Sequence, residues 1–369
     1  MKIICNKSDI MNGVNISLRA VPGKTTMPIL DCIVIRANAQ NIKFITNDME
    51  IAIETIVNGT VVDEGSVAIN AKIFAEIVRK LPDSDITIET TNYYMTTITC
   101  EKLEFTISTK SDEEFPAIPY VEKKDAIVMS QFSLKEIIRQ TVFCISDNES
   151  QKLMTGELFE VNGDEFRVVA LDGHRVALRK IHLKDKYKYT KAIIPGKTLN
   201  EIVKILSGEV NDNVSIYFTT NYVLFEFKNT IVLSRLIEGE YYKINQMISG
   251  EYETKLKVNR REFTDSIDRS TLLIRETDKK PIILDIKDFN MNLKVNSQIG
   301  SMNEDIEINK EGKDIAIGFN PKFLLDVLRV IDDEELYIYM TNSKAPCFIK
   351  NNDDTYIYLV LPINFNSMR

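Results

Sequence analysis

One amphipathic helical pattern occurs three times in this chain, at residues 71–81, 196–206 and 321–331. Its first lysine falls at Lys72, Lys197 and Lys322, so that both intervals span 125 residues. An interval of this length is the size of a domain and much longer than the repeat of a solenoid. The pattern therefore predicts three related domains in tandem.

Each copy divides its residues between two faces of a helix, because successive side chains are rotated by about 100°. In the first copy, the apolar face consists of Ile73, Phe74, Ile77, Val78 and Leu81. The opposite face of every copy carries a cation, an acid and a second cation in the same order. These residues are Lys72, Glu76 and Arg79, then Lys197, Glu201 and Lys204, then Lys322, Asp326 and Arg329. The three charged faces are either simply solvated or parts of one shared surface.

The composition is that of an ordinary globular protein, with 44% apolar and 27% charged residues. Lysine and arginine number 46 against 54 aspartates and glutamates, and the net charge of −8 argues mildly against nucleic acid as a partner. Acidic clusters such as residues 112–114 and 332–335 leave room for a positive surface elsewhere. We expect domains at residues 1–122, 123–249 and 250–369.

The cysteines and the apolar runs indicate a cytoplasmic protein. Five cysteines without a CxxC pair are typical of free, mostly buried thiols in a reducing compartment, namely Cys5, Cys32, Cys100, Cys144 and Cys347. The start of the chain lacks the apolar segment of a secretory signal. The longest apolar run, residues 356–363, is far shorter than the roughly 20 residues that span a bilayer, so no membrane partner is expected.

Each predicted domain begins with a second helical segment, at residues 7–21, 134–146 and 260–274. Ser133 followed by Glu136 indicates a capping box at the start of the middle segment. After each shared helix the hydrophobic period changes to two, which predicts strands at 85–89, 214–218 and 335–339 and further strands at 95–100, 222–227 and 356–361. Asn162-Gly163 indicates one of the turns between strands. We therefore predict an α+β fold, with two helices on an antiparallel sheet in each domain.

Two motifs that suggest enzyme chemistry lack the residues that such chemistry needs. Asp172, His174 and Arg175 suggest acid–base catalysis, but no serine or cysteine motif supplies a nucleophile. Residues 22–25 and 195–198 resemble the end of a phosphate loop, yet no glycine stands at the required earlier position. The histidines and cysteines do not have metal-ligand spacing. We expect no catalytic residue, no metal and no cofactor.

The chain resembles the bacterial sliding clamp, the β subunit of DNA polymerase III, over essentially its whole length. The most specific motifs are residues 171–177, Leu-Asp-Gly-His-Arg-Val-Ala, and residues 358–363, Tyr-Leu-Val-Leu-Pro-Ile. The segments 24–30 and 115–116 add to the resemblance. It implies three tandem pseudo-repeats of a DNA-clamp domain in a non-catalytic processivity subunit. It also implies that two subunits assemble head to tail into a closed ring, which encircles duplex DNA without sequence specificity.

By this resemblance, the repeated cations line the hole of the ring and meet phosphates without reading bases. The expected DNA-binding residues are Lys24, Lys72, Arg79, Lys135, Arg139, Lys197, Lys204, Lys322 and Arg329. The acids Glu76, Glu201 and Asp326 would moderate the attraction. Such contacts should be weak, mobile and sensitive to salt, because the closed ring, and not affinity, retains the DNA.

The resemblance also implies a groove for short peptides of the polymerase III α subunit, other polymerases, the clamp loader and repair proteins. Apolar pockets would take leucine or phenylalanine anchors. The expected groove residues are Met154, Leu171, Gly173, His174, Arg175, Val176, Tyr242, Met247, Pro346, Val360, Leu361, Pro362 and Ile363. From the residues alone, an ordinary core at a domain boundary explains this set equally well. Tyr242, Gln246 and Lys344 depart from the family pattern, which affects the shape of the pockets and the preferred peptide.

Ring closure by family analogy places Phe105 and Ile107 of one subunit against Leu272 and Leu273 of the other. Leu272 and Leu273 are also compatible with an ordinary core position. An alternative to the ring is a three-domain protein-interaction scaffold that keeps the groove but does not encircle DNA. The acidic net charge and the irregular first helix favour this alternative.

Overall fold

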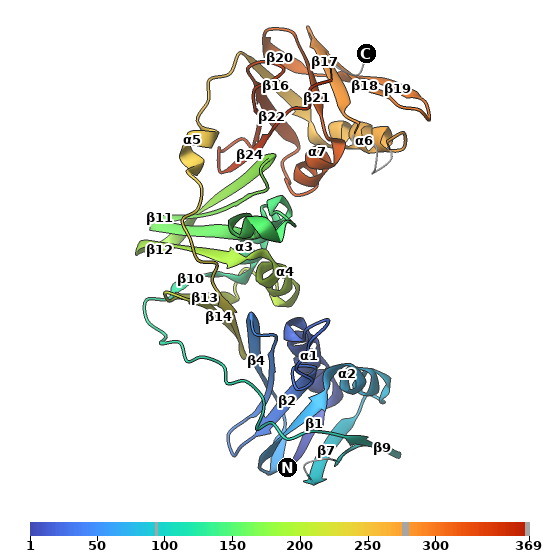
Figure 1. Cartoon of the computed structure of the whole chain (residues 1–369), viewed down its shortest axis with the longest axis vertical. Coiled ribbons are helices and arrows are strands. Elements are labelled where there is room, and N and C mark those ends of the chain that lie inside the picture. Colours follow the sequence, from blue (N-terminus) through green and yellow to red (C-terminus); the bar gives the residue numbers. More distant parts are fainter. Residues whose placement is uncertain (93–94, 275–279, 366–369) are drawn as a thin grey trace. The chain divides into compact units, whose positions relative to one another are not determined.

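Six helices occur where the three predicted repeats place them (Figure 1). The computed structural model describes residues 1–92, 95–274 and 280–365, and all counts refer to these residues. The helices are α1 (Lys7–Ser17), α2 (Ala71–Lys80), α3 (Gln131–Arg139), α4 (Gly196–Ile205), α6 (Arg260–Thr271) and α7 (Pro321–Leu328). The remaining helical segments are α5 (Ile244–Ile248), η1 (Leu18–Ala20), η2 (Val142–Cys144) and η3 (Glu149–Thr155). The six helices predicted from the sequence are confirmed.

Contacts divide the chain into two units, and each unit holds two antiparallel sheets. The first unit is Met1–Lys135 with Asn200–Leu236, and the second is Glu136–Leu199 with Ile237–Arg369. In the first unit, a five-stranded sheet has the order β5 (Thr60–Asp63), β1 (Lys2–Asn6), β7 (Asp85–Asn92), β8 (Met95–Cys100) and β9 (Leu103–Ser108). Its eight-stranded sheet has the order β10 (Ile127–Ser130), β13 (Asn213–Phe218), β14 (Tyr222–Phe227), β15 (Thr230–Arg235), β4 (Ile51–Val57), β3 (Ile42–Asn47), β2 (Cys32–Ala37) and β6 (Gly65–Asn70).

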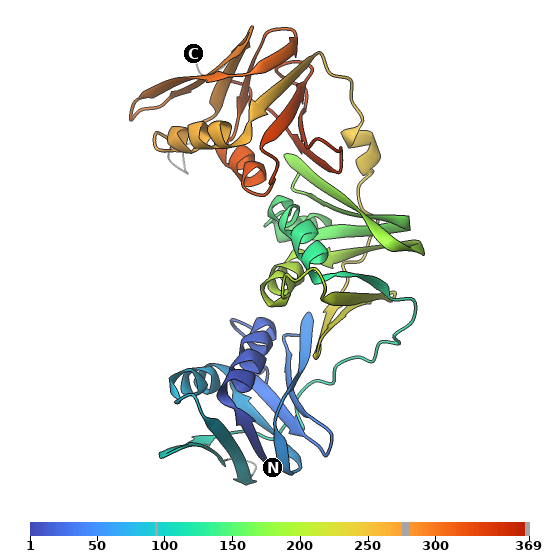
Figure 2. The same ribbon diagram turned by 180° about the vertical axis from the view of Figure 1, so that it is seen from behind.

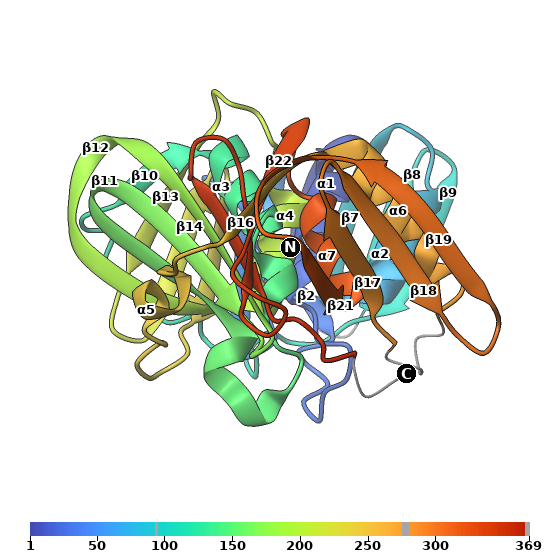
Figure 3. The ribbon, with the colours of Figure 1, turned by 90° about the horizontal axis from the view of Figure 1, so that it is seen from above.

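The second unit combines a seven-stranded and a four-stranded sheet. The seven-stranded sheet has the order β11 (Gly156–Leu171), β12 (Arg175–Pro195), β24 (Tyr356–Val360), β23 (Cys347–Lys350), β22 (Glu335–Met340), β16 (Thr254–Asn259) and β20 (Asn309–Gly312). The four-stranded sheet has the order β19 (Ser301–Glu307), β18 (Asn290–Asn296), β17 (Ile282–Lys287) and β21 (Ile315–Phe319). Strands β17, β18 and β19 are visible side by side in Figure 3.

Two of the sheets contain strands from different sequence repeats. Strand β15 pairs with β4, so the eight-stranded sheet continues from the first repeat into the second. The buried hydroxyls of Thr55 and Thr230 lie 2.8 Å apart within this pairing. Strand β12 pairs with β24, with Arg175 opposite Val360, and so joins the second repeat to the third. Backbone hydrogen bonds therefore link consecutive repeats within each unit.

The buried face of the shared helix largely follows the predicted apolar stripe. Phe74 and Val78 of α2 are fully buried, and Phe74 meets Phe44 edge to face with 6.0 Å between ring centroids. Helices α1 and α2 lie on the same side of the strands of the first repeat (Figure 2). The placement of Ile73 on the buried face was wrong. Its side chain is 52% exposed, because the small Ala71 and Ala75 turn inward on the side of the helix that meets the sheet.

The predicted capping box of the second repeat is also wrong. Helix α3 begins at Gln131, and the Ser130 hydroxyl accepts a hydrogen bond from the Ser133 backbone N–H at 3.0 Å. Four other helices are capped by an asparagine side chain that accepts a backbone N–H, a residue type favoured at this position. These caps are Asn6, Asn70, Asn259 and Asn320.

The predicted turn at Asn162-Gly163 is instead an irregularity within β11. The strand continues through it, and its pairing with β12 shifts register between Val161 and Gly163 and again before Glu165. Gly163 has a φ of 63°, a conformation that glycine adopts without a steric penalty. An extra residue of this kind forms a bulge, which bends a strand without ending it.

The five cysteines are free and buried, as predicted. Burial, followed by the charges of Asp9 and Asp85, raises the pKa of Cys5 to about 12, so this thiol stays protonated at neutral pH. Within the described ranges, no helix is long and apolar enough to cross a membrane. The described residues also contain no group of three histidine, cysteine or carboxylate side chains able to hold a metal ion.

A buried carboxyl in the core of the second unit should make stability depend on pH. Both carboxyl oxygens of Glu157 are buried, and burial raises the pKa of this carboxyl well above its ordinary value, although the Thr141 hydroxyl opposes the rise. The unfolded chain releases this proton near pH 4.3, whereas the folded chain keeps it, so stability falls as the pH rises above that value. Glu157→Gln should remove this fall, because an amide at this position does not titrate between the folded and unfolded states.

Urea unfolding at about pH 5 and about pH 8 tests this prediction. The parent chain should lose stability between the two conditions by more than Glu157→Gln does. Glu149→Gln, at an exposed position, is the matched control and should behave like the parent. Parallel pH profiles of the parent and Glu157→Gln would show that the carboxyl does not titrate as proposed.

Candidate DNA-facing helices and candidate peptide groove

The repeated cations lie on the exposed side of their helices. Lys72 and Arg79 project from α2, Lys197 and Lys204 from α4, and Lys322 from α7, all at exposed positions. Arg329 follows α7, and its side chain is 61% exposed. The opposite face of each helix is buried, through Phe74 and Val78, Leu199 and Ile202, and Leu324 and Leu328. Each helix thus presents its two cations to solvent, which is the arrangement that a phosphate-binding surface requires.

The repeated acids pair with the cations in two of the three helices. Glu76 pairs with Arg79, three residues later on α2, and both side chains are more than half exposed. Glu201 pairs with Lys204 at 2.7 Å and lies 3.7 Å from Arg19. Exposed pairs of this kind contribute at most about 1 kcal/mol and weaken with salt. The cations can therefore exchange a carboxylate for a phosphate at little cost.

The third helix does not follow this pattern. Arg329 pairs with Asp268 of α6 at 3.2 Å, whereas Asp326 pairs with Arg175 at 2.6 Å. The expected role of Asp326 as a moderator of the cationic surface is therefore wrong. Its carboxylate instead pairs with the buried guanidinium of Arg175, at the start of β12.

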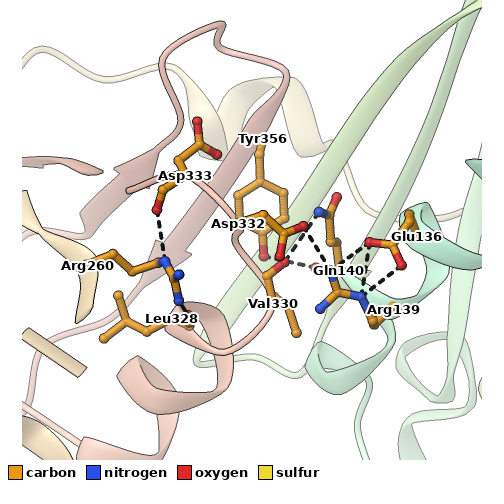
Figure 4. Close-up of polar contacts among 9 residues, drawn as sticks. All are labelled: Glu136, Arg139, Gln140, Arg260, Leu328, Val330, Asp332, Asp333 and Tyr356. Carbon is orange, nitrogen blue, oxygen red and sulfur yellow. Dashed lines mark hydrogen bonds and ion pairs between the residues drawn. The ribbon is translucent and has the colours of Figure 1, made fainter. Parts of the chain in front are cut away.

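Arg139 is held in a polar network at the end of α3 (Figure 4). Its guanidinium pairs with Glu136 at 2.6 Å and with Asp332, after α7, at 3.2 Å. The hydrogen bonds that Arg139 donates to Glu136, together with the charges of Glu136 and Asp332, raise the pKa of Arg139. Next to it, the Gln140 Nε2 atom donates to the Val330 carbonyl at 3.3 Å, and the backbone carbonyl of Gln140 accepts a hydrogen bond from the Tyr356 hydroxyl at 2.9 Å. Arg139 thus joins α3 to the segment that follows α7.

Two further expected DNA contacts lie outside the shared helices. Lys24 is exposed in the loop that precedes β2. Lys135 of α3 is half-buried, and its ammonium group donates to the Leu206 carbonyl at 3.3 Å. Lys24 is therefore accessible to a ligand, whereas the Lys135 ammonium group already makes a hydrogen bond within the first unit.

The turn between β11 and β12 brings the most specific sequence motif into a rigid shape. The Asp172 Oδ1 atom accepts hydrogen bonds from the backbone N–H groups of His174 at 2.9 Å and Arg175 at 3.1 Å. Gly173 has a φ of 88°, which favours glycine at this position. The His174 carbonyl accepts from the Leu361 backbone N–H at 2.9 Å. The motif therefore sits directly beside the end of the final strand.

Arg175 supports this turn from within the protein. Its side chain is only 7% exposed and forms ion pairs with Asp172 at 2.9 Å and Asp326 at 2.6 Å. It also donates to the Phe143 carbonyl at 2.8 Å, and its guanidinium carbon lies 4.4 Å from the centre of the Phe323 ring. The Arg175 side chain is therefore occupied in joining the turn to α7. The acid–base role considered for Asp172 and Arg175 has no support in this geometry, because both groups are used in structural contacts.

Three apolar groove residues, Leu171, Val176 and Met154, meet in one hydrophobic cluster of the second unit. Leu171 and Val176 are buried in this cluster with Tyr241, and Met154 packs against it from its edge. Val360 is fully buried at the end of β24, where it pairs with Cys347, the residue after Pro346. The cluster forms the floor that an apolar peptide side chain would need.

Other residues of the predicted groove remain accessible above this floor. Met247 is 39%, Leu361 38% and Tyr242 36% exposed, and Gly173 and His174 are exposed in the turn. Pro346, Pro362 and Ile363 are half-buried, and the Ile363 N–H donates to the Gly318 carbonyl at 2.8 Å. Residues 366–369, at the end of the chain, lie outside the described residues. The residues of the predicted groove thus come from five segments that are separate in the sequence, at 154, 171–176, 242–247, 346 and 360–363.

The expected dimer contacts lie on an edge strand and just after a helix. Phe105 and Ile107 belong to β9, the edge strand of the five-stranded sheet, and Phe105 is 37% exposed. Leu272 is 80% exposed just after α6, whereas Leu273 packs partly against the core. In the other unit, β19 is the edge strand of the four-stranded sheet. Sequence reasoning named the side chains but missed these edges, which become visible only when the strand order is known.

A separate cleft of about 880 Å³ lies in the second unit and contains none of the predicted site residues. Its walls include Val258, Phe289 and Ile308, with the acids Glu262, Asp288 and Glu307 around them. No sequence pattern indicates this cleft, because its residues come from separate strands and turns.

Comparisons with known proteins agree with this geometry. Family models of the DNA polymerase III beta subunit match the N-terminal domain at residues 1–119, the central domain at 128–243 and the C-terminal domain at 245–364. The beta sliding clamp of Bacillus subtilis is 35% identical over 98% of this chain and 99% of its own length. The beta sliding clamp of Staphylococcus aureus is 34% identical over the same shares.

Solved structures are similar over the whole chain. A putative DNA polymerase III beta subunit from Eubacterium rectale has a TM-score of 0.96 at 58% identity, covering 99% of this chain and 100% of that chain. The Bacillus subtilis sliding clamp has a TM-score of 0.95 at 35% identity, covering 99% of each chain.

The fold is that of a three-domain DNA clamp. The chain belongs to the family of DNA polymerase III beta subunits, the bacterial beta sliding clamps. It is accordingly a non-catalytic processivity factor of DNA replication, in a family whose partners are DNA, a DNA polymerase and a second copy of the same subunit.

Removing the buried guanidinium should destabilise the second unit. Arg175→Met would leave Asp172 and Asp326 without their partner in a largely buried site, so we expect a loss of about 3–5 kcal/mol in unfolding free energy. Arg79→Met, which breaks the exposed pair on α2, is the control and should change stability much less. Urea unfolding of both variants measures the difference. Similar small losses in the two variants would contradict the assignment of Arg175 as the support of the turn.

Proposed function

We propose that two copies of this chain close head to tail into a ring around duplex DNA. Two features support this closure. The edge strands β9 and β19 offer unpaired backbone groups, and the exposed Phe105 and Leu272 offer apolar area. Phe105 and β9 lie in the first sequence repeat, whereas Leu272 and β19 lie in the third. Twelve helices packed about 9 to 10 Å apart would enclose an opening near 25 Å, wide enough for a duplex. The domain boundaries of this subunit would lie near residues 122 and 249, and the protein would act in the cytoplasm.

The repeated cations would form the inner surface of the ring. The six cations of the shared helices are exposed, namely Lys72, Arg79, Lys197, Lys204, Lys322 and Arg329. The carboxylates that pair with Arg79, Lys204 and Arg329 hold these three only weakly. Lys24 would add a contact at the rim, whereas Lys135 and Arg139 would contribute less because they have partners within the protein. Contacts to phosphates alone do not select a base sequence, so the ring would slide.

The groove around the β11–β12 turn would tether partners by short peptides. Leu171, Val176 and Met154 would receive leucine or phenylalanine anchors, and backbone groups near His174 and Leu361 would fix the peptide chain. We propose that peptides from the replicative polymerase, the clamp loader and repair proteins share this site. The observation that carries the proposal is the recurrence of one exposed cationic helix face in all three domains of a sliding-clamp chain.

A three-domain scaffold that does not encircle DNA is the alternative. It would keep the groove, but it would have no use for equivalent cationic faces in three domains. The net charge of −8 does not favour the scaffold over the ring, since the acidic cluster at 332–335 lies outside those faces.

Charge reversal on α4 should separate the two surfaces. Lys197→Glu with Lys204→Glu should lower loader-dependent retention on circular DNA roughly tenfold, because repulsion replaces phosphate attraction. Peptide binding at the groove should be unchanged in a fluorescence anisotropy assay. Lys184→Glu with Lys188→Glu, at exposed positions of β12, is the control with the same change of charge. An equal loss of peptide affinity in the α4 variant would show that the surfaces are not separate.

Native mass spectrometry should find the chain at twice its mass of 42.3 kDa. Leu272→Glu should shift this population to the monomer, because a charge would be buried at the subunit contact. Val210→Glu, at a position that is 65% exposed, should remain dimeric. A stable monomer of the unmodified chain at micromolar concentration would remove the closed ring from consideration.

A further inference from the structure

A cavity of about 310 Å³ lies beside the predicted groove in the second unit. One wall comes from the β11–β12 hairpin and includes Glu160, Arg167, Tyr189 and Lys191. The other wall is the segment 240–246, which leads into α5 (Figures 1 and 3). We call this cavity the side pocket. Of its lining residues, Tyr242 alone belongs to the groove predicted from the sequence.

The floor of the side pocket is an ordered polar network. Arg167 forms an ion pair with Glu160, and the two side chains are only 18% and 12% exposed. The Tyr189 hydroxyl donates to Glu160 at 2.7 Å, and the Arg167 Nη1 atom donates to the Asn245 Oδ1 atom at 2.9 Å. The Glu160 carboxylate thus already has two donors. These contacts hold the polar side chains in place, so a ligand would bind to a preorganised surface.

The rim of the side pocket carries excess positive charge. Lys191 and Lys243 line it and are exposed, and neither ammonium group has an ion-pair partner in the described part of the chain. Glu240 is the one acid of the lining that is likewise unpaired among the described residues. Two lysines against one glutamate favour a ligand that carries a carboxylate over one that carries an ammonium group.

The side pocket is continuous with the groove through a pair of tyrosines. Tyr242 lines the pocket and belongs to the predicted groove, and its ring meets Tyr241 edge to face at 5.8 Å. Tyr241 is buried in the cluster that contains Leu171 and Val176. Tyr242 and Gln246, which both line the pocket, are two of the positions where this chain departs from the family pattern.

We propose that the side pocket binds an acidic residue of the partner peptide, next to the apolar anchors that occupy the groove. This inference rests on the proposed function of the groove. Lys191 and Lys243 would attract the carboxylate, while Tyr242 would separate it from the apolar anchor. The side pocket would thus select among partner peptides by the charge that flanks their anchors.

Fluorescence anisotropy with short labelled peptides tests the inference. One peptide carries leucine and phenylalanine anchors flanked by alanine, and matched peptides carry aspartate, asparagine or lysine at each flanking position in turn. At one flanking position, aspartate should bind roughly twofold to fivefold more tightly than asparagine, and lysine should bind more weakly. The advantage of aspartate should shrink at high salt.

Two double variants assign the effect to the side pocket. Lys191→Ala with Lys243→Ala should abolish the preference for aspartate while leaving the affinity for the alanine-flanked peptide as it was. Lys184→Ala with Lys188→Ala, on the same hairpin but outside the pocket, should keep the preference.

The outcomes distinguish this inference from the proposed function. If the alanine-flanked peptide binds but aspartate, asparagine and lysine are equivalent at every position, the side pocket has no role and the groove stands. A preference for aspartate that survives in Lys191→Ala with Lys243→Ala also overturns the inference. If no anchored peptide binds at all, the proposed function of the groove fails, and the inference fails with it.

Discussion

Burial of one apolar face on each shared helix determines where the cations of this chain lie. Phe74 and Val78 of α2 are inside the protein, so Lys72 and Arg79 must project to solvent. The same division on α4 and α7 gives three equivalent faces in a chain with a net charge of −8. Their charges are weakly paired, and at physiological ionic strength they act over only about 8 Å. A surface of this kind attracts phosphates without fixing them, which suits a subunit that must move along DNA.

Strand pairing and one buried arginine give the groove its rigidity. The pairing of β12 with β24 places the turn at Gly173 beside Leu361, and Arg175 ties that turn to Asp326 of α7. Helix α7 therefore has two roles. Its outer face carries Lys322, whereas Asp326 supports the groove from behind. The candidate DNA surface and the candidate peptide groove are made of different residues, yet in the second unit they share this helix.

The sequence predicted the helices and many strands, because hydrophobic periodicity and a repeat of 125 residues depend only on local order. It placed the start of α3 wrongly, since Ser130 rather than Ser133 accepts the capping hydrogen bond. It also took Asn162-Gly163 for a turn, because a bulge and a turn both favour glycine with positive φ. Arg139 pairs with Asp332, and Arg175 pairs with Asp326. The partners are far apart in the chain, so the local hydrophobic periodicity cannot predict these ion pairs. The side pocket was missed for the same reason.

Retention on closed circular DNA, compared before and after the circle is cut, tests the ring most directly. The chain would be loaded by a clamp loader, and the fraction that stays bound would be measured in salt high enough to screen phosphate contacts. The ring predicts lasting retention on the circle and rapid loss once the DNA is linear, because a closed ring can leave only over an end. Equal retention on both forms would contradict it and leave only ordinary binding.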